Sequence, residues 1–434
     1  DVIEGSLTYE KRYGKVANMK TWITYAAAIA MGFSASLLLG EFALFDTIVG
    51  SVVPVLIDIG VFILFPMVFI TFASGISSLR RHSRTSLMFF TTILWSLFTT
   101  MVLSAAAAAV FKLLPFTLND TTAISRFTVL PDGLDKITAT RVFSLLFHRN
   151  AFMQFFASDS HLLPIISIAA VIGYALKPNI EVIRPAYVVM NSFSEAMFRI
   201  ARFFAVFGAI TVGFTASSFF RTVDFDGMFY TNLSYFSIIG IATFIALFVI
   251  LPLLFVLFTG FRRGNPYRVL FGATAACLAG FFTSNQLWAT TVLLPTARKN
   301  NQIQKRIAGT TLPLYTILGK GGSAMMATVT LLVLITMATK KVPSWTEAMV
   351  AAAFCSIFSL LSSFNLGYET LAILLMACSA MSIDLQSLNL MVLALLPIIG
   401  GAATMIDTAI AAFGSAYSSR LIVTGMKTPY RELI

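Results

Sequence analysis

Charged side chains are scarce in this chain of 434 residues, where they make up 11% of the total, against about 25% in soluble domains. Cysteine and histidine are scarcer still, with three of each. The cysteines lie in apolar stretches without Cys-x-x-Cys spacing, which argues against a disulfide framework and a zinc site. Neither His-Glu-x-x-His nor Gly-x-Ser-x-Gly occurs, so the sequence predicts no enzyme, no metal centre and no cofactor.

Long apolar runs are what the sequence has instead, since 58% of its residues are hydrophobic. A helix needs about 20 apolar residues to cross a bilayer. Four segments meet that length with at most one charge each: 22–40, 49–79, 86–111 and 235–259. The sequence therefore predicts an all-α polytopic membrane protein, which excludes soluble enzymes, fibres and disordered chains. We expect helices near 20–42, 47–79, 83–114, 162–177, 180–218 and 233–261.

The formal net charge is +11, from 30 lysines and arginines and 19 acidic residues. A basic soluble protein would suggest nucleic acid as a partner, but the sequence contains no nucleic-acid-binding motif. With the N-terminus inside, more than twice as many basic residues flank the spans on the inner side as on the outer side. Because cytoplasmic loops are enriched in lysine and arginine, we expect a multi-pass protein of the cell (inner) membrane with both termini in the cytoplasm.

One cluster of charge lies within the span expected at 180–218. Glu195, Arg199 and Arg202 follow one another at i, i+4 and i+7. This spacing favours an ion pair within the helix over a ligand site.

The second half of the chain is broken into shorter apolar pieces. In 265–300 and 345–386, a polar run separates two apolar arms of about 12–16 residues, too short to cross alone. Two such units are typical of the opposed re-entrant hairpins of secondary transporters, although ordinary hairpins with polar tips in loops remain the alternative. Between them, 307–339 is interrupted by Gly-Lys-Gly-Gly-Ser at 319–323, and Asp407 lies in a later apolar span. Because glycines free backbone groups that bind ions and solutes, we expect the functional site near this interruption.

Short motifs accompany this order of segments: Phe-Pro-Met-Val-Phe at 65–69, Ser-Gly-Ile at 74–76 and Leu-Pro-Leu at 312–314. Together with the sequence of hairpin, broken helix, hairpin and final helix, they resemble the glutamate transporter family of dicarboxylate/amino acid:cation symporters. The resemblance covers the chain from the first helix through Arg420. It implies eight transmembrane helices plus two re-entrant helical hairpins, an elevator-type movement and a homotrimer.

The resemblance also implies a division into two domains. The scaffold comprises residues 1–82 and 162–232, and the transport domain that carries the solute comprises 83–114 and 233–425. Residues 115–161, which are punctuated by Asp, Thr, Pro and Gly, are expected to form an outer loop.

The chain departs from the family at the residues that hold sodium and solute. The family's broken helix carries Asn-Met-Asp-Gly-Thr, whose Asp helps to hold sodium; at 319–323 this Asp is missing, and Lys320 stands where the family has Met. In the last helix, the family's solute-binding Asp and Arg become Thr404 and Asp407, and its second sodium-binding Asp becomes Ser415. An acidic amino acid would meet a carboxylate there instead of a guanidinium, which argues against glutamate and aspartate as solutes.

The resemblance and the polarity of the expected core together give a set of site residues. We expect the solute to be bound by Asn285, Gln286, Ser363, Asn365, Thr404, Asp407 and Thr408. We expect coupling to involve Lys320, Ser323, Glu369, Asp407 and Ser415. Three hypotheses stay open: Lys320 replaces a lost sodium ion, Asp407 or Glu369 binds a coupled proton, or Lys320 merely pairs with one of these acids.

The sequence thus predicts a secondary active transporter of the symporter type for a small polar organic solute of the amino acid or carboxylate class. Its coupling would be to protons, or at least independent of sodium. An uncoupled facilitator or channel of the same fold is the alternative.

Overall fold

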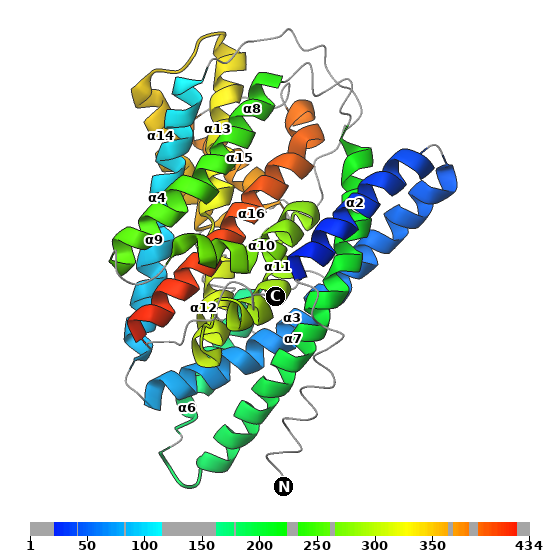
Figure 1. Cartoon of the computed structure of the whole chain (residues 1–434). Coiled ribbons are helices and arrows are strands. Elements are labelled where there is room, and N and C mark those ends of the chain that lie inside the picture. The colour runs from blue at the N-terminus through cyan, green and yellow to red at the C-terminus, as the bar shows by residue number, and fades with distance from the viewer. Residues whose placement is uncertain are drawn as a thin grey trace.

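The computed structural model describes residues 21–40, 42–81, 84–114, 162–177, 179–223, 233–260, 265–362, 368–381 and 389–422. Every regular element within these ranges is a helix, which confirms the prediction of an all-α protein. The helices form two groups that lie side by side (Figure 1). The loop predicted at 115–161 lies outside the described residues.

The first group consists of α2 (Thr21–Leu39), α3 (Ala43–Arg81), α6 (Leu162–Ala175) and α7 (Arg184–Thr222). α7 packs along α2 and α3, and α6 packs on α3 (Figure 1). The outer faces of these helices carry large exposed apolar side chains, among them Leu38, Phe62 and Phe203. A row of exposed apolar side chains is typical of a helix face that meets hydrocarbon instead of water.

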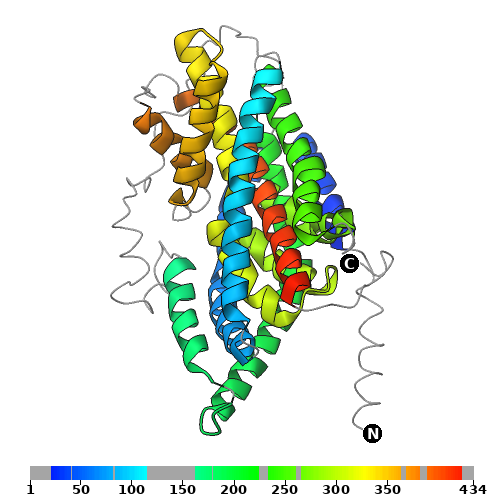
Figure 2. The same cartoon turned by 90° about the vertical axis from the view of Figure 1, so that its left-hand side faces the viewer.

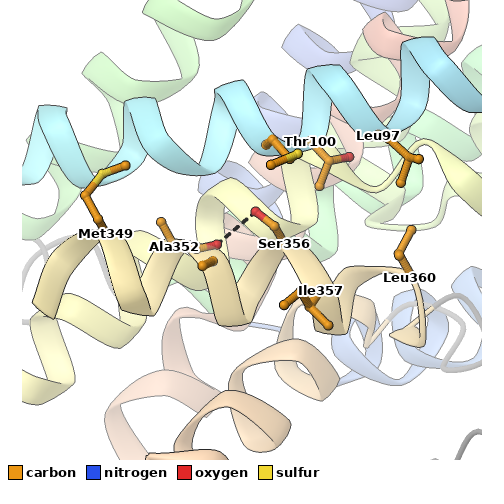
Figure 3. Close-up of a pocket in the computed structure, with 9 residues that line it drawn as sticks. Leu97, Thr100, Met349, Ala352, Ser356, Ile357 and Leu360 are labelled. Carbon is orange, nitrogen blue, oxygen red and sulfur yellow. Dashed lines mark hydrogen bonds between the residues drawn. The ribbon is translucent and has the colours of Figure 1, made fainter. Parts of the chain in front are cut away.

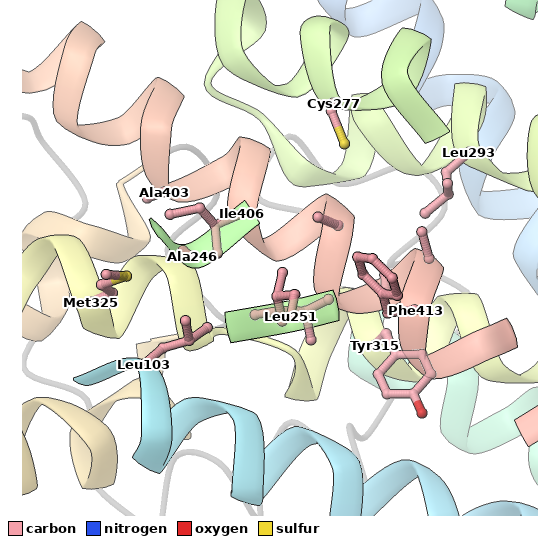
Figure 4. Packing of buried hydrophobic residues seen from close by; sticks show 14 of the residues in the cluster. Leu103, Ala246, Leu251, Cys277, Leu293, Tyr315, Met325, Ala403, Ile406 and Phe413 are labelled. Carbon is pink, nitrogen blue, oxygen red and sulfur yellow. The ribbon is translucent and has the colours of Figure 1, made fainter. Parts of the chain in front are cut away.

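The second group consists of α4 (Thr85–Leu113), α8 (Leu233–Ile245), the short π-helix η3 (Ala246–Ile250), α9 (Leu251–Thr259), α10 (Pro266–Thr283), α11 (Gln286–Lys299), α12 (Lys305–Leu318), α13 (Gly321–Thr339), α14 (Trp345–Ser359), α15 (Glu369–Ala380) and α16 (Asn389–Ile422). α16 packs on α10, α12 and α13, and its most apolar 18-residue stretch is 78% buried, against 17% for α2. α16 therefore lies in the core and α2 at the periphery. Figure 4 shows this core, where Leu103, Leu251, Met325 and Phe413 come together from four helices.

Seven of the described helical stretches are long and apolar enough to cross a membrane: Thr21–Leu39, Ala43–Arg80, Thr85–Leu113, Arg184–Thr222, Leu233–Thr259, Lys305–Thr339 and Leu395–Ile422. This confirms the prediction of a multi-pass membrane protein. α6, which the sequence predicts as a further span, has 14 residues in the described part of the chain. At about 1.5 Å per residue it is shorter than a hydrocarbon core of about 30 Å, so the count of eight spans stays a prediction.

A proline in the span predicted at 233–261 produces the π-helix η3. Pro252 has no N–H to donate, and its ring collides with the carbonyl four residues earlier in a regular helix. The backbone widens to a π-helix over Ala246–Ile250, directly before the turn that contains Pro252, and then continues as α9. The span is thus continuous, but it contains a bulge that its apolar pattern does not reveal.

The two groups of helices meet where α10, α11 and α12 pack on α3 and α7, and Trp288 of α11 lies at this interface. Its indole lies against Gly60 of α3 and Gly208 of α7, and a Cβ atom at either glycine would collide with the ring. The Nε1 of Trp288 donates to the carbonyl of Leu56 at 3.3 Å. Glycine at both positions leaves the space that the large ring fills.

Ion pairs join the same two groups near the end of α11. Glu195 of α7 contacts Arg298 of α11 at 3.1 Å and Lys305 of α12 at 3.3 Å. The spacing of Glu195, Arg199 and Arg202 predicts a partner on the same helix, whereas the structure gives Glu195 partners on two other helices. Helical periodicity shows only which residues lie near one another on the same helix. Here the contacts of α7 with α11 and α12 determine the partners of Glu195.

Candidate functional site

The interruption of the helix at 319–323 lies in the core of the second group. α12 ends at Leu318 and α13 begins at Gly321, so Gly319 and Lys320 lie between the two helices. α13 packs on α15 and α16, and α11 packs on α12 and α16. Residues at the interruption therefore lie within reach of both helical pairs that the sequence predicts as hairpins.

The first helical pair is formed by α10 and α11, which pack against each other and are joined by Ser284 and Asn285. Ser284 has a left-handed backbone (φ 49°), which reverses the chain. The side chain of Asn285 accepts from the backbone N–H of Trp288 at 3.1 Å and so caps the start of α11. Asn285, which the sequence predicts as a solute ligand, thus uses its side-chain oxygen to hold the turn.

The second helical pair is formed by α14 and α15, which also pack against each other. Ser344 and Glu347 begin α14 with a capping box, in which each side chain accepts from the other residue's backbone N–H. In both views this pair lies at the opposite end of the molecule from α6 and the start of α7 (Figures 1 and 2). Its tip, with the predicted solute ligands Ser363 and Asn365, lies outside the described residues.

Lys320 bridges the two helical pairs. Its side chain is 3% exposed, and its Nζ donates to Oε1 of Gln286 at the start of α11. The same Nζ forms an ion pair with Oε1 of Glu369, the first residue of α15, at 3.1 Å. Of the two acids that the sequence offers as partners for Lys320, the structure pairs it with Glu369.

A small cavity lies beside this bridge. It is lined by Leu162, Gln286, Leu287, Thr316, Ile317, Lys320 and Glu369. The space is about 10 Å³, which is near the minimum that one water requires. The Nε2 of Gln286 is buried and has no hydrogen-bond partner among the described residues. Thr316, one helical turn before Lys320 on the broken helix, also lines the cavity, and no motif in the sequence marks it.

Asp407 lies on the other side of the interruption and is 1% exposed. Its Oδ1 accepts from the backbone N–H of Gly322 at 2.6 Å. Its Oδ2 accepts from the hydroxyl of Ser323 at 2.6 Å and from the N–H of Ser323 at 3.3 Å. Both carboxylate oxygens are therefore bound to the first turn of α13. The expected role of Asp407 in solute binding and coupling stays a prediction.

The remaining predicted residues of α16 lie apart from the bridge. Thr404 and Thr408 donate within their own helix, to Gly400 and Thr404 respectively, and face Gly280 of α10. Ser415 accepts from the hydroxyl of Thr311 at 2.9 Å. Of the predicted set, the structure thus brings together Gln286, Lys320 and Glu369 as one cluster and Asp407 and Ser323 as another.

An apolar groove of about 270 Å³ lies between α4 and α14, as Figure 3 shows. Its walls include Leu97, Met349 and Ile357. The hydroxyl of Ser356 is turned back to the carbonyl of Ala352 on the same helix, at 2.8 Å. The groove therefore offers little to a polar solute. No group of three His, Cys, Asp or Glu side chains that could hold a metal ion occurs within the described ranges.

A multi-pass helical protein with an interrupted helix and two helical pairs around buried charges has the architecture of a secondary transporter. Comparison with protein families identifies which kind. The profile of the sodium:dicarboxylate symporter family matches residues 20–422, so the chain belongs to that family. This match confirms the resemblance to the glutamate transporter family. Members of the family are transporters and not enzymes.

Among curated proteins, the chain is similar to the neutral amino acid transporter B(0) of Oryctolagus cuniculus. The two are 25% identical over 168 residues, which is 38% of this chain. The match spans 30% of the relative's own length. The similarity therefore supports the family, and the solute of this chain has to be inferred from its own residues.

Proposed function

We propose that this chain is a secondary transporter for a small polar solute of the amino acid or carboxylate class, and that it works without bound sodium. The observation that carries the proposal is the Nζ of Lys320, which lies buried between the two helical pairs. The similarity to a neutral amino acid transporter supports the amino acid class.

The fixed charge of Lys320 is the reason to expect independence from sodium. Two unit charges 4 Å apart repel each other by about 4 kcal/mol at an effective dielectric constant of about 20. A sodium ion bound beside Lys320 would meet this repulsion, because the carboxylate of Glu369 is already paired with the ammonium, and the acid that the family supplies there is missing from 319–323. The ammonium instead supplies a positive charge at this place and contacts both helical pairs.

The proposal includes the movement that the family resemblance implies. Residues 1–82 and 162–232 would form a trimeric scaffold, and residues 83–114 and 233–425 would carry the solute between the two sides of the membrane. Both helical pairs would be re-entrant, and both termini cytoplasmic. The contact of Trp288 with Gly60 and Gly208 lies at the interface across which this movement would take place, so the movement requires that the ring leave its place against these glycines.

The experiment that tests the proposal measures the thermal stability of the purified chain with amino acids, dicarboxylates and cationic metabolites, in sodium and in choline. A ligand that binds only the native state at 100 times its Kd stabilises it by about 2.7 kcal/mol. We expect the same ligand shift in both salts. A shift that requires sodium would overturn the proposal, because it would show that other groups still hold the ion.

An uncoupled facilitator is the second candidate, since Glu369 already neutralises Lys320 and no further ion is then needed for charge balance. Uptake into proteoliposomes separates the two. A coupled carrier accumulates solute above its outside concentration when a pH gradient is applied, whereas a facilitator only equalises the two concentrations.

A further inference from the structure

The side-chain amide of Gln286 is used at one end only. Gln286 is 3% exposed, and its Oε1 accepts from the Nζ of Lys320. Only the carbonyl end of an amide can accept from an ammonium, so the Nε2 end must point away from Lys320. There it is buried without a partner in the described part of the chain. An unsatisfied buried donor costs free energy, and the cavity beside Gln286 is the side from which an acceptor can reach this one.

A second donor borders the same cavity. The ammonium of Lys320 has three N–H groups, and the described contacts use two of them, toward Gln286 and Glu369. Gln286 and Lys320 line the cavity together with Glu369. Two donor side chains that border one cavity, one of them charged, are suited to a carboxylate, which accepts through two oxygens.

Glu369 already binds the Lys320 half of the place where such a carboxylate would bind. Its Oε1 lies 3.1 Å from Nζ of Lys320, and it is the first residue of α15 in the second helical pair. The remaining space of about 10 Å³ has no room for a further carboxylate. A solute carboxylate can therefore reach Lys320 only if the side chain of Glu369 leaves.

We propose that Gln286 and Lys320 form the carboxylate subsite of the transported solute, and that Glu369 is an internal carboxylate that occupies the Lys320 half of this subsite in the empty carrier. The proposal rests on the proposed function and adds the residues that bind the solute's carboxylate and the residue that competes with it. Because Glu369 belongs to the second helical pair, exchange of its carboxylate for the solute's detaches that pair from Lys320. Glu369 is thus a specificity-determining residue that competes with the solute.

The test measures the affinity of the full-length purified chain for alanine and succinate by titration calorimetry in choline, with alaninamide, succinamide and chloride as further probes. Glu369→Gln keeps the shape of the side chain and removes the competing charge. We expect it to tighten binding of a carboxylate about tenfold and to leave binding of the amides unchanged. Gln286→Leu, which removes one donor, is expected to weaken carboxylate binding about tenfold.

A matched control is Glu347→Gln, the same substitution at the start of the same helical pair, where Glu347 completes the capping box of α14. It should leave the affinity unchanged. Unchanged or weaker carboxylate binding by Glu369→Gln would overturn the proposal, as would equal binding of the amides or the same response to chloride alone. If Glu369→Gln does not fold, Gln286→Leu decides: unchanged carboxylate affinity overturns the subsite.

The outcomes also separate this proposal from sodium independence. If wild-type binding requires sodium but Glu369→Gln still tightens it for carboxylates only, the proposed function is wrong in its coupling and the subsite stands. If binding is independent of sodium but insensitive to Glu369→Gln, the coupling stands and the subsite is wrong. No carboxylate binding by either form, in sodium or in choline, would overturn the subsite.

Discussion

Two buried charged clusters flank the same interruption of the helix, and they differ in how completely their hydrogen bonds are made. On one side, both oxygens of Asp407 accept from the first turn of α13. On the other side, Lys320 has partners on two helical pairs, and the Nε2 of Gln286 has none in the described residues. Both clusters are buried and contain charged groups, a single carboxylate in one and an ion pair in the other, so burial alone does not distinguish a structural charge from a working one. The completeness of the hydrogen bonding is the difference on which we base that distinction.

The partners of each cluster explain the difference. Asp407 binds backbone N–H groups at the N-terminus of a 19-residue helix, where the free amides and the helix dipole both favour a negative charge. These donors are fixed in place by the helix itself. Lys320 is held by side chains from two separate elements, so movement of one element breaks the contact. The first cluster stabilises the interruption, and the second can respond to a ligand.

Replacing Asp407 with alanine should have the largest effect on stability. It leaves the amides of Gly322 and Ser323 and the hydroxyl of Ser323 without an acceptor in a buried site. We expect the free energy of unfolding to fall by about 3–5 kcal/mol. Thermal unfolding in detergent, followed by circular dichroism, measures the loss. Asp407→Asn retains one acceptor oxygen and should lose less; equal stability of Asp407→Ala and wild type would contradict the structural role.

A smaller loss is expected when the approach of α13 to Asp407 is blocked. A Cβ atom at Gly322 would collide with the carbonyl of Ala403 and lie 2.9 Å from Oδ1 of Asp407. Gly322→Ala should therefore cost about 1–3 kcal/mol, as other overpacked cores do. Gly400→Ala is the matched control, because the nearest atoms to its Cβ are at 3.6 Å, in ordinary contact. The control should be neutral or slightly stabilising, and equal losses from both variants would contradict a close contact at Gly322.

The sequence allowed much of this arrangement to be predicted, because apolar runs and glycines are local signals. The spans, the two helical pairs and the interruption at 319–323 all follow from them. The partners of the charges did not follow. Asp407 lies 85 positions from the amide of Gly322 to which it binds, and no periodicity relates the two. A position at which the chain departs from the family's residue marks a changed site. Only the packing shows whether the new side chain has hydrogen-bond partners.

The same limit applies to Glu195 and Gln286. Helical spacing predicts an intrahelical partner for Glu195, whereas the structure pairs it with Arg298 and Lys305. Gln286 was predicted as a solute ligand from its place in a polar tip, yet its unpartnered Nε2 is visible only once Lys320 is placed beside its other end. The sequence shows which polar groups are present, and the fold determines which of them have no hydrogen-bond partner.

The sharpest test of the comparison is to make the Lys320 cluster apolar. Lys320→Met alone leaves Glu369 buried and unpaired, which is expected to be strongly destabilising. The triple variant Gln286→Leu, Lys320→Met, Glu369→Leu removes all the polar groups of this cluster together. Replacing a buried ion pair by apolar side chains of similar size changes the free energy of unfolding little. We expect its free energy of unfolding to lie within about 1 kcal/mol of wild type, while its response to carboxylates is lost.

No equivalent rescue exists for Asp407, because its donors include backbone amides that mutation cannot remove. Thermal unfolding of the two sets of variants, each with and without a carboxylate ligand, gives the comparison directly. If the triple variant unfolds as easily as Asp407→Ala, the Lys320 cluster also holds the fold together, and the distinction between a structural and a working charge fails. If it is stable but no longer binds, the buried lysine is retained for its ligand, since the fold does not require it.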